Sequence, residues 1–174
     1  MNNTFPFLTQ FEDKVPAIHD TVYVDISARI IGDVVIHEGA SIWPMVVLRA
    51  DTSKIVIGRR AVISDFAFIE SPEGYPVKIE EEALVSHGAK IHGAHIGSRS
   101  LVGIDAIVLD GAVISPGSII GAGSFIAAGA FVPPDSLVMG IPGRVIREIK
   151  PAERDNIQRQ IELLYEKSRK YMGL

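Results

Sequence analysis

Residues 96–138 read IGSRSLVGIDAIVLDGAVISPGSIIGAGSFIAAGAFVPPDSLV, and an aliphatic residue returns at every sixth position of this stretch. The recurring residues are Ile96, Val102, Val108, Ile114, Ile120, Ile126, Val132 and Val138. The residue four places after each of them is usually alanine or serine. A period of six fits neither an amphipathic helix nor a simple alternating strand. It is typical of a parallel β-helix of hexapeptide repeats, in which each coil buries its aliphatic residues against the neighbouring coils.

The same period is present upstream, although two insertions interrupt it. The aliphatic positions are Ile18, Val24, Ile30, Ile36, Ile42 and Leu48, then Ile57, Ile63 and Ile69, then Ile79, Val85 and Ile91. The repeat therefore fills 17–140 of one domain that spans residues 1–174. The insertions at 52–54 and 71–75 predict loops, the second because proline and glycine favour a turn.

The two ends of the chain have a different pattern. Residues 1–16 are expected to form an N-terminal arm, and 141–150 a turn and linker that follow the Gly140–Gly143 break. Residues 151–172 are expected to form a C-terminal α-helix, since Pro151 suits the first helical position. Its apolar residues, Ile157 and Ile161 among them, recur at helical spacing. This stripe predicts that the helix packs on the side of the β-helix; the alternative is a helix that binds a partner.

Composition narrows the classes of partner and the compartment. The net charge of −4 and the scattered basic residues argue against a nucleic-acid partner or an anionic membrane. No apolar run approaches the roughly 20 residues of a membrane span, and the first residues lack the layout of a secretion signal. The chain has no cysteine, which excludes disulfides and thiolate metal sites. We therefore expect a cytoplasmic protein.

Polar side chains follow three of the aliphatic positions. If three hexapeptides make one coil, every third aliphatic residue stacks in one column, about 4.8 Å from the next. The residues directly after Leu48, Ile69 and Ile91 should then face outward, because side chains alternate along a strand. These residues are Arg49, Glu70 and His92. A cation, a carboxylate and an imidazole are thus predicted to line one outer column.

A further histidine is predicted on another face. His87 comes two residues after Val85, as Asp65 comes two residues after Ile63, in the next column. His87 therefore belongs to a different face from Glu70 and His92. If the three side chains meet, the simplest geometry brings His87 from a neighbouring subunit.

Several motifs in this order and spacing resemble the γ-class carbonic anhydrases. They are Ser41-Ile42-Trp43, Leu48-Arg49-Ala50-Asp51, Ser64-Asp65, Ser86-His87-Gly88, Ile91-His92-Gly93 and the stretch 101–112. The resemblance covers about 12–150 and the terminal helix. The repeat alone is shared by many acyltransferases, so the paired histidines, Ser-Asp and Arg-x-Asp carry most of the resemblance.

The resemblance implies a left-handed, triangular β-helix that assembles as a homotrimer. It also implies a metal ion, usually zinc although iron or cobalt also serve, bound by three histidines between subunits. Two of these positions match His87 and His92, from different chains, and the third falls on Glu70. The positions of Arg49, Asp51, Ser64 and Asp65 belong to the catalytic site of the family. The implied reaction is reversible hydration of CO₂ to bicarbonate, a lyase activity, through a metal-bound hydroxide.

Two residues depart from the family pattern. Glu70 replaces a histidine ligand, and Ser64 stands where the family commonly has glutamine. Two histidines and one carboxylate are an accepted ligand set for zinc or iron. The added negative charge, however, should make the bound water less acidic. Arg49 competes for Glu70 if the two form an ion pair; in the family the arginine more often meets the Asp51 position, which is the pairing we favour.

These departures leave the question of enzymatic activity open at the level of sequence. The main alternative is a catalytically silent trimeric scaffold or assembly subunit that has kept the trimer and lost the site. A hexapeptide acyltransferase is a weaker alternative, because no long loop carries a lone catalytic histidine.

Overall fold

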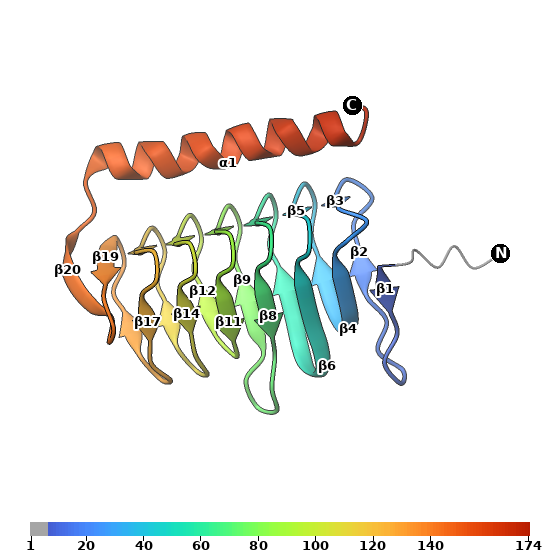
Figure 1. The fold of residues 1–174 in the computed structure, drawn as a ribbon, viewed down its shortest axis with the longest axis horizontal. Helices are drawn as coiled ribbons and strands as arrows, with labels where there is room; N and C mark the ends of the chain where they lie inside the picture. Colours follow the sequence, from blue (N-terminus) through green and yellow to red (C-terminus); the bar gives the residue numbers. More distant parts are fainter. Residues whose placement is uncertain (1–6) are drawn as a thin grey trace.

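The computed structural model describes residues 7–174, and the chain forms a prism of stacked coils with one helix along its side (Figure 1). The strands lie in two sheets that wrap around a single aliphatic core. The first sheet contains β1 (Leu8–Thr9), β2 (Ala17–Ile18), β4 (Arg29–Ile36), β6 (Val47–Ile57), β8 (Phe68–Glu70), β9 (Val77–Ile79), β11 (Lys90–His92), β12 (His95–Ile96), β14 (Ile107–Val108), β15 (Val113–Ile114), β17 (Phe125–Ile126) and β18 (Phe131–Val132).

The second sheet forms the remaining side of the prism. It contains β3 (Tyr23–Val24), β5 (Ser41–Ile42), β7 (Val62–Ile63), β10 (Leu84–Val85), β13 (Leu101–Val102), β16 (Ile119–Ile120), β19 (Ser136–Met139) and β20 (Arg144–Glu148). Pairing between coils is parallel, and aliphatic residues meet in register, as Leu48, Ile69, Ile91 and Val108 do. The hexapeptide period therefore yields the predicted left-handed parallel β-helix.

The first sheet bends around one edge of the prism. Its strand order runs β17-β14-β11-β8-β6-β9-β12-β15-β18, so the long strand β6 belongs to two faces. One face carries β8, β11, β14 and β17, and the next carries β9, β12, β15 and β18. The candidate site lies on the first of these faces.

The insertion at 52–54 does not form the expected loop, because β6 runs without a break from Val47 to Ile57. Its extra residues are held in extended form by Ser71, whose carbonyl accepts from the Ser53 N–H at 3.0 Å and whose hydroxyl donates to the Ser53 carbonyl at 2.6 Å. The excursion at 71–75, by contrast, is a turn, as predicted.

The segment 141–150, expected to be a turn and linker, contains a strand. β20 pairs antiparallel with β19 and begins directly after the turn at 140–143. The physical reason is that the last coil presents a row of backbone groups with no further coil to bind. At the other end, β1 in the expected arm pairs with β4, in parallel orientation. The part of the arm at 1–6 lies outside the described residues.

The helix α1 (Pro151–Tyr171) runs back along the second sheet (Figure 1). Ile157 and Ile161 are buried against Tyr23, Trp43 and Leu84, which confirms the predicted docking. The sequence places Trp43 as an outward aromatic residue on a coil face, which predicts packing at a subunit interface. It is instead only 5% exposed, because α1 of the same chain covers it. Within residues 7–174, no helix is long and apolar enough to span a membrane.

Replacing Ile161 with alanine is expected to lower the free energy of unfolding by about 2–5 kcal/mol, because its fully buried side chain joins α1 to the second sheet. Denaturant unfolding followed by circular dichroism measures the loss. Leu163→Ala is the matched control, since Leu163 is 57% exposed and its truncation should cost less than about 0.5 kcal/mol. Equal losses in the two variants would contradict the docking role of Ile161.

Candidate metal centre

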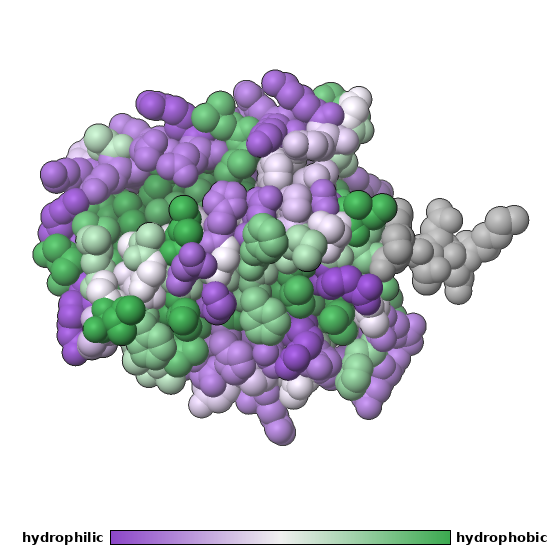
Figure 2. Space-filling model, in the orientation of Figure 1, coloured by the Kyte–Doolittle hydropathy of each residue, from purple (hydrophilic) through white to green (hydrophobic). Residues whose placement is uncertain are grey.

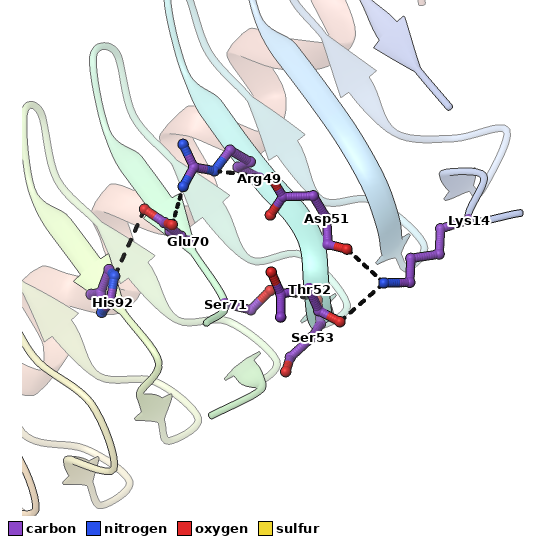
Figure 3. Close-up of polar contacts among 8 residues, drawn as sticks. All are labelled: Lys14, Arg49, Asp51, Thr52, Ser53, Glu70, Ser71 and His92. Carbon is purple, nitrogen blue, oxygen red and sulfur yellow. Dashed lines mark hydrogen bonds and ion pairs between the residues drawn. The ribbon is translucent and has the colours of Figure 1, made fainter. Parts of the chain in front are cut away.

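The predicted outer column is present on the face formed by β6, β8 and β11 (Figure 3). Arg49 lies in β6, and Glu70 and His92 are the last residues of β8 and β11. Arg49 is in register with Glu70, and Glu70 with His92. The three side chains therefore stack on successive coils.

Arg49 contacts both of the acidic partners considered for it. Its guanidinium donates a hydrogen bond to Glu70 Oε1. Its Nε lies 3.5 Å from Asp51 Oδ2 but makes no hydrogen bond to any described residue. The two pairings are thus not exclusive, and the hydrogen bond goes to Glu70 rather than to the favoured Asp51. Arg49 fixes one carboxylate oxygen of Glu70 and leaves the other, Oε2, toward His92.

Glu70 and His92 are spaced like two ligands of one metal ion. Glu70 Oε2 lies 3.7 Å from His92 Nε2, which is too long for a hydrogen bond. Two zinc ligands with bonds of about 2.0–2.1 Å at a tetrahedral angle have donor atoms about 3.4 Å apart. The Glu70 side chain is 18% exposed and the His92 side chain 35%, so the gap between them is open to one side. The pair fits a divalent cation.

The second nitrogen of His92 has a partner that the sequence analysis missed. His92 Nδ1 makes a hydrogen bond with Asp110 Oδ1. Asp110 lies in the turn that follows β14, one coil beyond His92. Extending the outer column by one coil leads to Leu109, and Asp110 is the next residue. A search of the turns that flank the column could have found it.

His87 lies in the turn between β10 of the second sheet and β11 of the first, at the corner between that sheet and the face that carries Glu70 and His92. Its Nδ1 is 3.1 Å from Asp65 Oδ2, and its side chain is 58% exposed. This contact leaves Nε2 available on the outside of the molecule. Within one chain, no three His, Asp or Glu side chains of the described residues could hold a metal ion together. A single subunit therefore brings together the pair Glu70 and His92 but not His87.

Exposed apolar side chains flank His87 along its row of turns. Hydrogen bonds stack these turns, for example from the Gly88 N–H to the Asp65 carbonyl and from the Asp105 N–H to the His87 carbonyl. The apolar residues on this row, which we call the apolar corner, are Ile26, Met45, Phe66 and Ile104, with exposures of 75%, 52%, 65% and 50%. Such a ridge around a half-exposed histidine is suited to burial against another surface.

Ser64 and Asp65 also border a hollow of about 320 Å³ between the His87 turn and the end of α1. Ser64 is only 3% exposed, so it faces this hollow rather than bulk solvent. On the opposite wall, burial and a hydrogen bond to Asp25 raise the pKa of Tyr23 to about 12. Burial acts to raise the pKa of Asp25, but hydrogen bonds from Ser27 outweigh it and hold the value below its usual range. Tyr23 is thus a permanent donor and Asp25 a permanent carboxylate near neutral pH.

His95 follows His92 by three residues, which makes it a candidate for a substitute ligand in the sequence. It lies on the next face, where its Nε2 is 3.0 Å from Glu80 Oε1. Hydrogen bonds from Lys78 and His95 hold the pKa of Glu80 below its ordinary value despite its partial burial. His19 contacts Thr21 at 2.9 Å.

The N-terminal arm supports the strand that carries Arg49. Lys14 Nζ donates to the backbone carbonyls of Asp51 and Thr52, at 2.5 and 3.1 Å (Figure 3). These contacts hold the backbone of β6 directly after the Arg49–Asp51 pair. No local sequence pattern marks Lys14 for this role, because its partners are backbone groups far along the chain.

Comparison with known proteins places this chain in a family. The chain is 46% identical over 150 residues to a protein of Methanocaldococcus jannaschii named "Probable carbonic anhydrase", covering 84% of this chain and 94% of that one. It is 36% identical over 143 residues to the Escherichia coli "Carnitine operon protein CaiE", covering 82% and 73%. A solved hexapeptide transferase family protein from Anaplasma phagocytophilum superposes with a TM-score of 0.91 at 32% identity, covering 94% and 97%. No protein-family model matches the sequence.

The repeat, the prism and the helix on its side define a hexapeptide-repeat β-helix protein. With its relatives, the chain belongs to the γ-class carbonic anhydrase-like family of these proteins. The names within this set are mixed, since an anhydrase, a carnitine operon protein and a transferase share the fold. Membership therefore shows the architecture, while the activity of this chain has to be argued from its own site.

Proposed function

We propose that this protein is a trimeric metalloprotein of the carbonic anhydrase type that hydrates CO₂ reversibly to bicarbonate. The metal, zinc by preference with iron or cobalt as alternatives, is bound by Glu70 and His92 of one subunit and His87 of the next. The observation that carries the proposal is the pair Glu70 Oε2 and His92 Nε2, which face each other at 3.7 Å without a hydrogen bond. The 46% identity to a protein named as an anhydrase supports the choice of reaction.

The apolar corner supports the shared site. His87 is exposed in the middle of this ridge, and its free Nε2 points away from its own subunit's Asp65. Figure 2 shows apolar and polar side chains interspersed over the visible face of the molecule. In a closed cyclic trimer, each corner meets the face of the next subunit. Three equivalent sites then form, each with ligands from two chains.

Each residue of the site has a separate task in this proposal. A bound divalent cation would supply Lewis acidity, which lowers the pKa of a water molecule enough to make hydroxide available near neutral pH. Arg49 holds Oε1 of Glu70, so that only Oε2 is free to bind the cation. The Asp65 carboxylate lies 3.1 Å from His87 Nδ1, so Nε2 is the ring nitrogen left facing outward. Ser64 and Asp51 provide a hydroxyl and a carboxylate for orienting water and substrate oxygens.

A silent assembly subunit is the second candidate, and specific residues favour it. Glu70 brings a negative charge to the metal where the family has a neutral imidazole, and Ser64 is shorter than the usual glutamine. Both changes weaken hydration chemistry without touching the aliphatic core. A structural relative that is named as a hexapeptide transferase makes acyl transfer a third outcome to test.

The first test of the proposal is the mass and metal content of the native protein. Light scattering should give about three times the chain mass of 18.8 kDa. Protein purified without chelator or nickel should contain about one metal ion per chain, and stopped-flow assays should show CO₂ hydration. A monomer contradicts the shared site. A metal-free trimer without hydration activity supports the silent subunit instead.

A further inference from the structure

The Asp110–His92 contact lies in the space that two glycines leave free, which we call the seat. Gly93 and Gly111 both have positive φ, of 60° and 68°. A Cβ on Gly93 would lie 2.7 Å from Asp110 Oδ1 and 2.6 Å from Tyr75 Cβ. A Cβ on Gly111 would lie 3.2 Å from the ring of Tyr75. The absence of both side chains lets the Asp110 carboxylate reach His92 while Tyr75, from the excursion at 71–75, packs beside it.

The backbone around this seat is fixed by the ladder between coils. The Gly93 N–H donates to the Glu70 carbonyl at 2.9 Å, and the Gly111 N–H donates to the Gly93 carbonyl at 2.7 Å. The Asp110 carbonyl accepts from the Gly129 N–H at 2.8 Å. Asp110 therefore reaches His92 from a rigid turn, and Glu70, His92 and Asp110 are tied to three successive coils.

The chemistry of this pair determines which nitrogen of His92 carries the proton. An ionised carboxylate only accepts hydrogen bonds, so His92 Nδ1 must be the N–H that donates to Asp110. In the neutral ring the lone pair is then on Nε2, the nitrogen that faces Glu70 Oε2 at 3.7 Å. The opposite tautomer would direct an N–H into the gap between Glu70 and His92, where a cation ligand needs a lone pair.

We propose that Asp110 is a positioning residue that holds His92 as the Nδ1–H tautomer with Nε2 free toward Glu70. Its effect on metal binding rests on the proposed function, whereas its effect on the tautomer does not. Asp110 contacts neither the substrate nor the cation in this arrangement. It acts through His92 alone, and the seat made by Gly93, Gly111 and Tyr75 holds it in place.

The tautomer can be measured in the full-length, metal-free protein. Long-range ¹H–¹⁵N spectra of ¹⁵N-histidine-labelled protein, recorded at a pH where the imidazoles are neutral, distinguish a protonated from an unprotonated ring nitrogen. The His92 signals are identified by their loss in His92→Gln. We expect the Nδ1–H form in the wild type, a shift toward the Nε2–H form in Asp110→Ala, and recovery in Asp110→Asn, whose amide oxygen can accept the same hydrogen bond.

Glu80→Ala is the matched control for Asp110→Ala, because Glu80 contacts His95 as Asp110 contacts His92. It should change the signals of His95 and leave those of His92 unaltered. An Nε2–H form of His92 in the wild type, or no change in Asp110→Ala, overturns the proposal. If Asp110→Ala does not fold, the wild type and Asp110→Asn decide the question, since an Nδ1–H form in both is expected.

Metal affinity is the second readout, measured by competition between the protein and a chelator for Zn²⁺. Removing an outer partner of a ligating histidine typically costs 10–100-fold in affinity. We expect a loss in this range for Asp110→Ala and a much smaller one for Asp110→Asn. Equal affinity of Asp110→Ala and wild type overturns the positioning role. A wild type that binds no Zn²⁺ refutes the proposed function instead, and the spectra then decide the role of Asp110.

Discussion

Mixing the His87→Ala and His92→Ala variants is expected to restore metal binding and CO₂ hydration that neither variant shows alone. In the proposed trimer, each variant by itself lacks one imidazole at every site. In a mixed trimer, a His87→Ala chain supplies an intact Glu70–His92 face, and a His92→Ala chain supplies an intact His87 corner. Random assembly of equal amounts pairs them correctly at about one quarter of the interfaces. Both quantities should therefore return to about one quarter of the wild-type value.

The two variants are unfolded together, refolded together and compared with the same variants refolded separately and then combined without exchange. His19→Ala serves as the surface control, since the described hydrogen bonds of the His19 side chain go to Thr21 and not to a residue of the site. If His87 and His92 of one chain served the same site, every chain in the mixture would be defective. No recovery from a mixture shown by mass to contain heterotrimers would refute the shared site.

The second large effect is expected at Glu70. Glu70→Gln keeps the size of the side chain and removes its charge, but an amide oxygen is a poor ligand for zinc. We expect its Zn²⁺ affinity to fall by more than the roughly 100-fold that the loss of an outer partner can cost. Glu70→His should retain the metal and raise the rate of CO₂ hydration, because a neutral ligand leaves the metal a stronger Lewis acid. The pH–rate profile should move to lower pH for the same reason.

Glu70→His also affects Arg49, because the substitution removes the carboxylate that accepts its hydrogen bond. Among the described residues, the acidic partner left to the Arg49 guanidinium is Asp51, at 3.5 Å. Light scattering of Glu70→His is therefore needed to confirm that the trimer is intact before rates are compared. Equal metal content in wild type, Glu70→Gln and Glu70→His would show that Glu70 is not a ligand. If Glu70→Gln loses the metal but Glu70→His hydrates CO₂ no faster than the wild type, Glu70 is a ligand. Its negative charge is then not what limits the rate of hydration.

The sequence predicts the β-helix and the outer column well because both follow from a repeat. Once Leu48, Ile69 and Ile91 stack, the alternation of side chains determines that Arg49, Glu70 and His92 face outward on successive coils. The helix was also predictable, since Ile157 and Ile161 show the face that must be buried. These features depend only on period and register.

The features that could not be predicted depend on contacts between distant segments. Nothing in residues 52–54 reveals that Ser71 and Lys14 will hold them in an extended strand. β20 forms because the last coil has an unpaired strand edge. No sequence pattern in 141–150 indicates that a strand will form there. Trp43 was assigned to an interface because the position of α1 over it depends on the tertiary structure. The contact between Asp110 and His92 could not be predicted, because it depends on the packing of two coils around Gly93, where a side chain would block the Asp110 carboxylate.

The course of α1 changes how the ends of the prism behave. In a row of repeats each unit contacts only its neighbours, so the terminal units open most readily. Here the 21-residue helix starts beside the last coils, and its Tyr171 ring stacks on Tyr23 near the first, at 5.5 Å between centroids. A rod of about 31 Å thus connects the two ends of the row. Fraying of either end must also detach the helix, so slow amide hydrogen exchange should extend to the outermost coils instead of fading toward them.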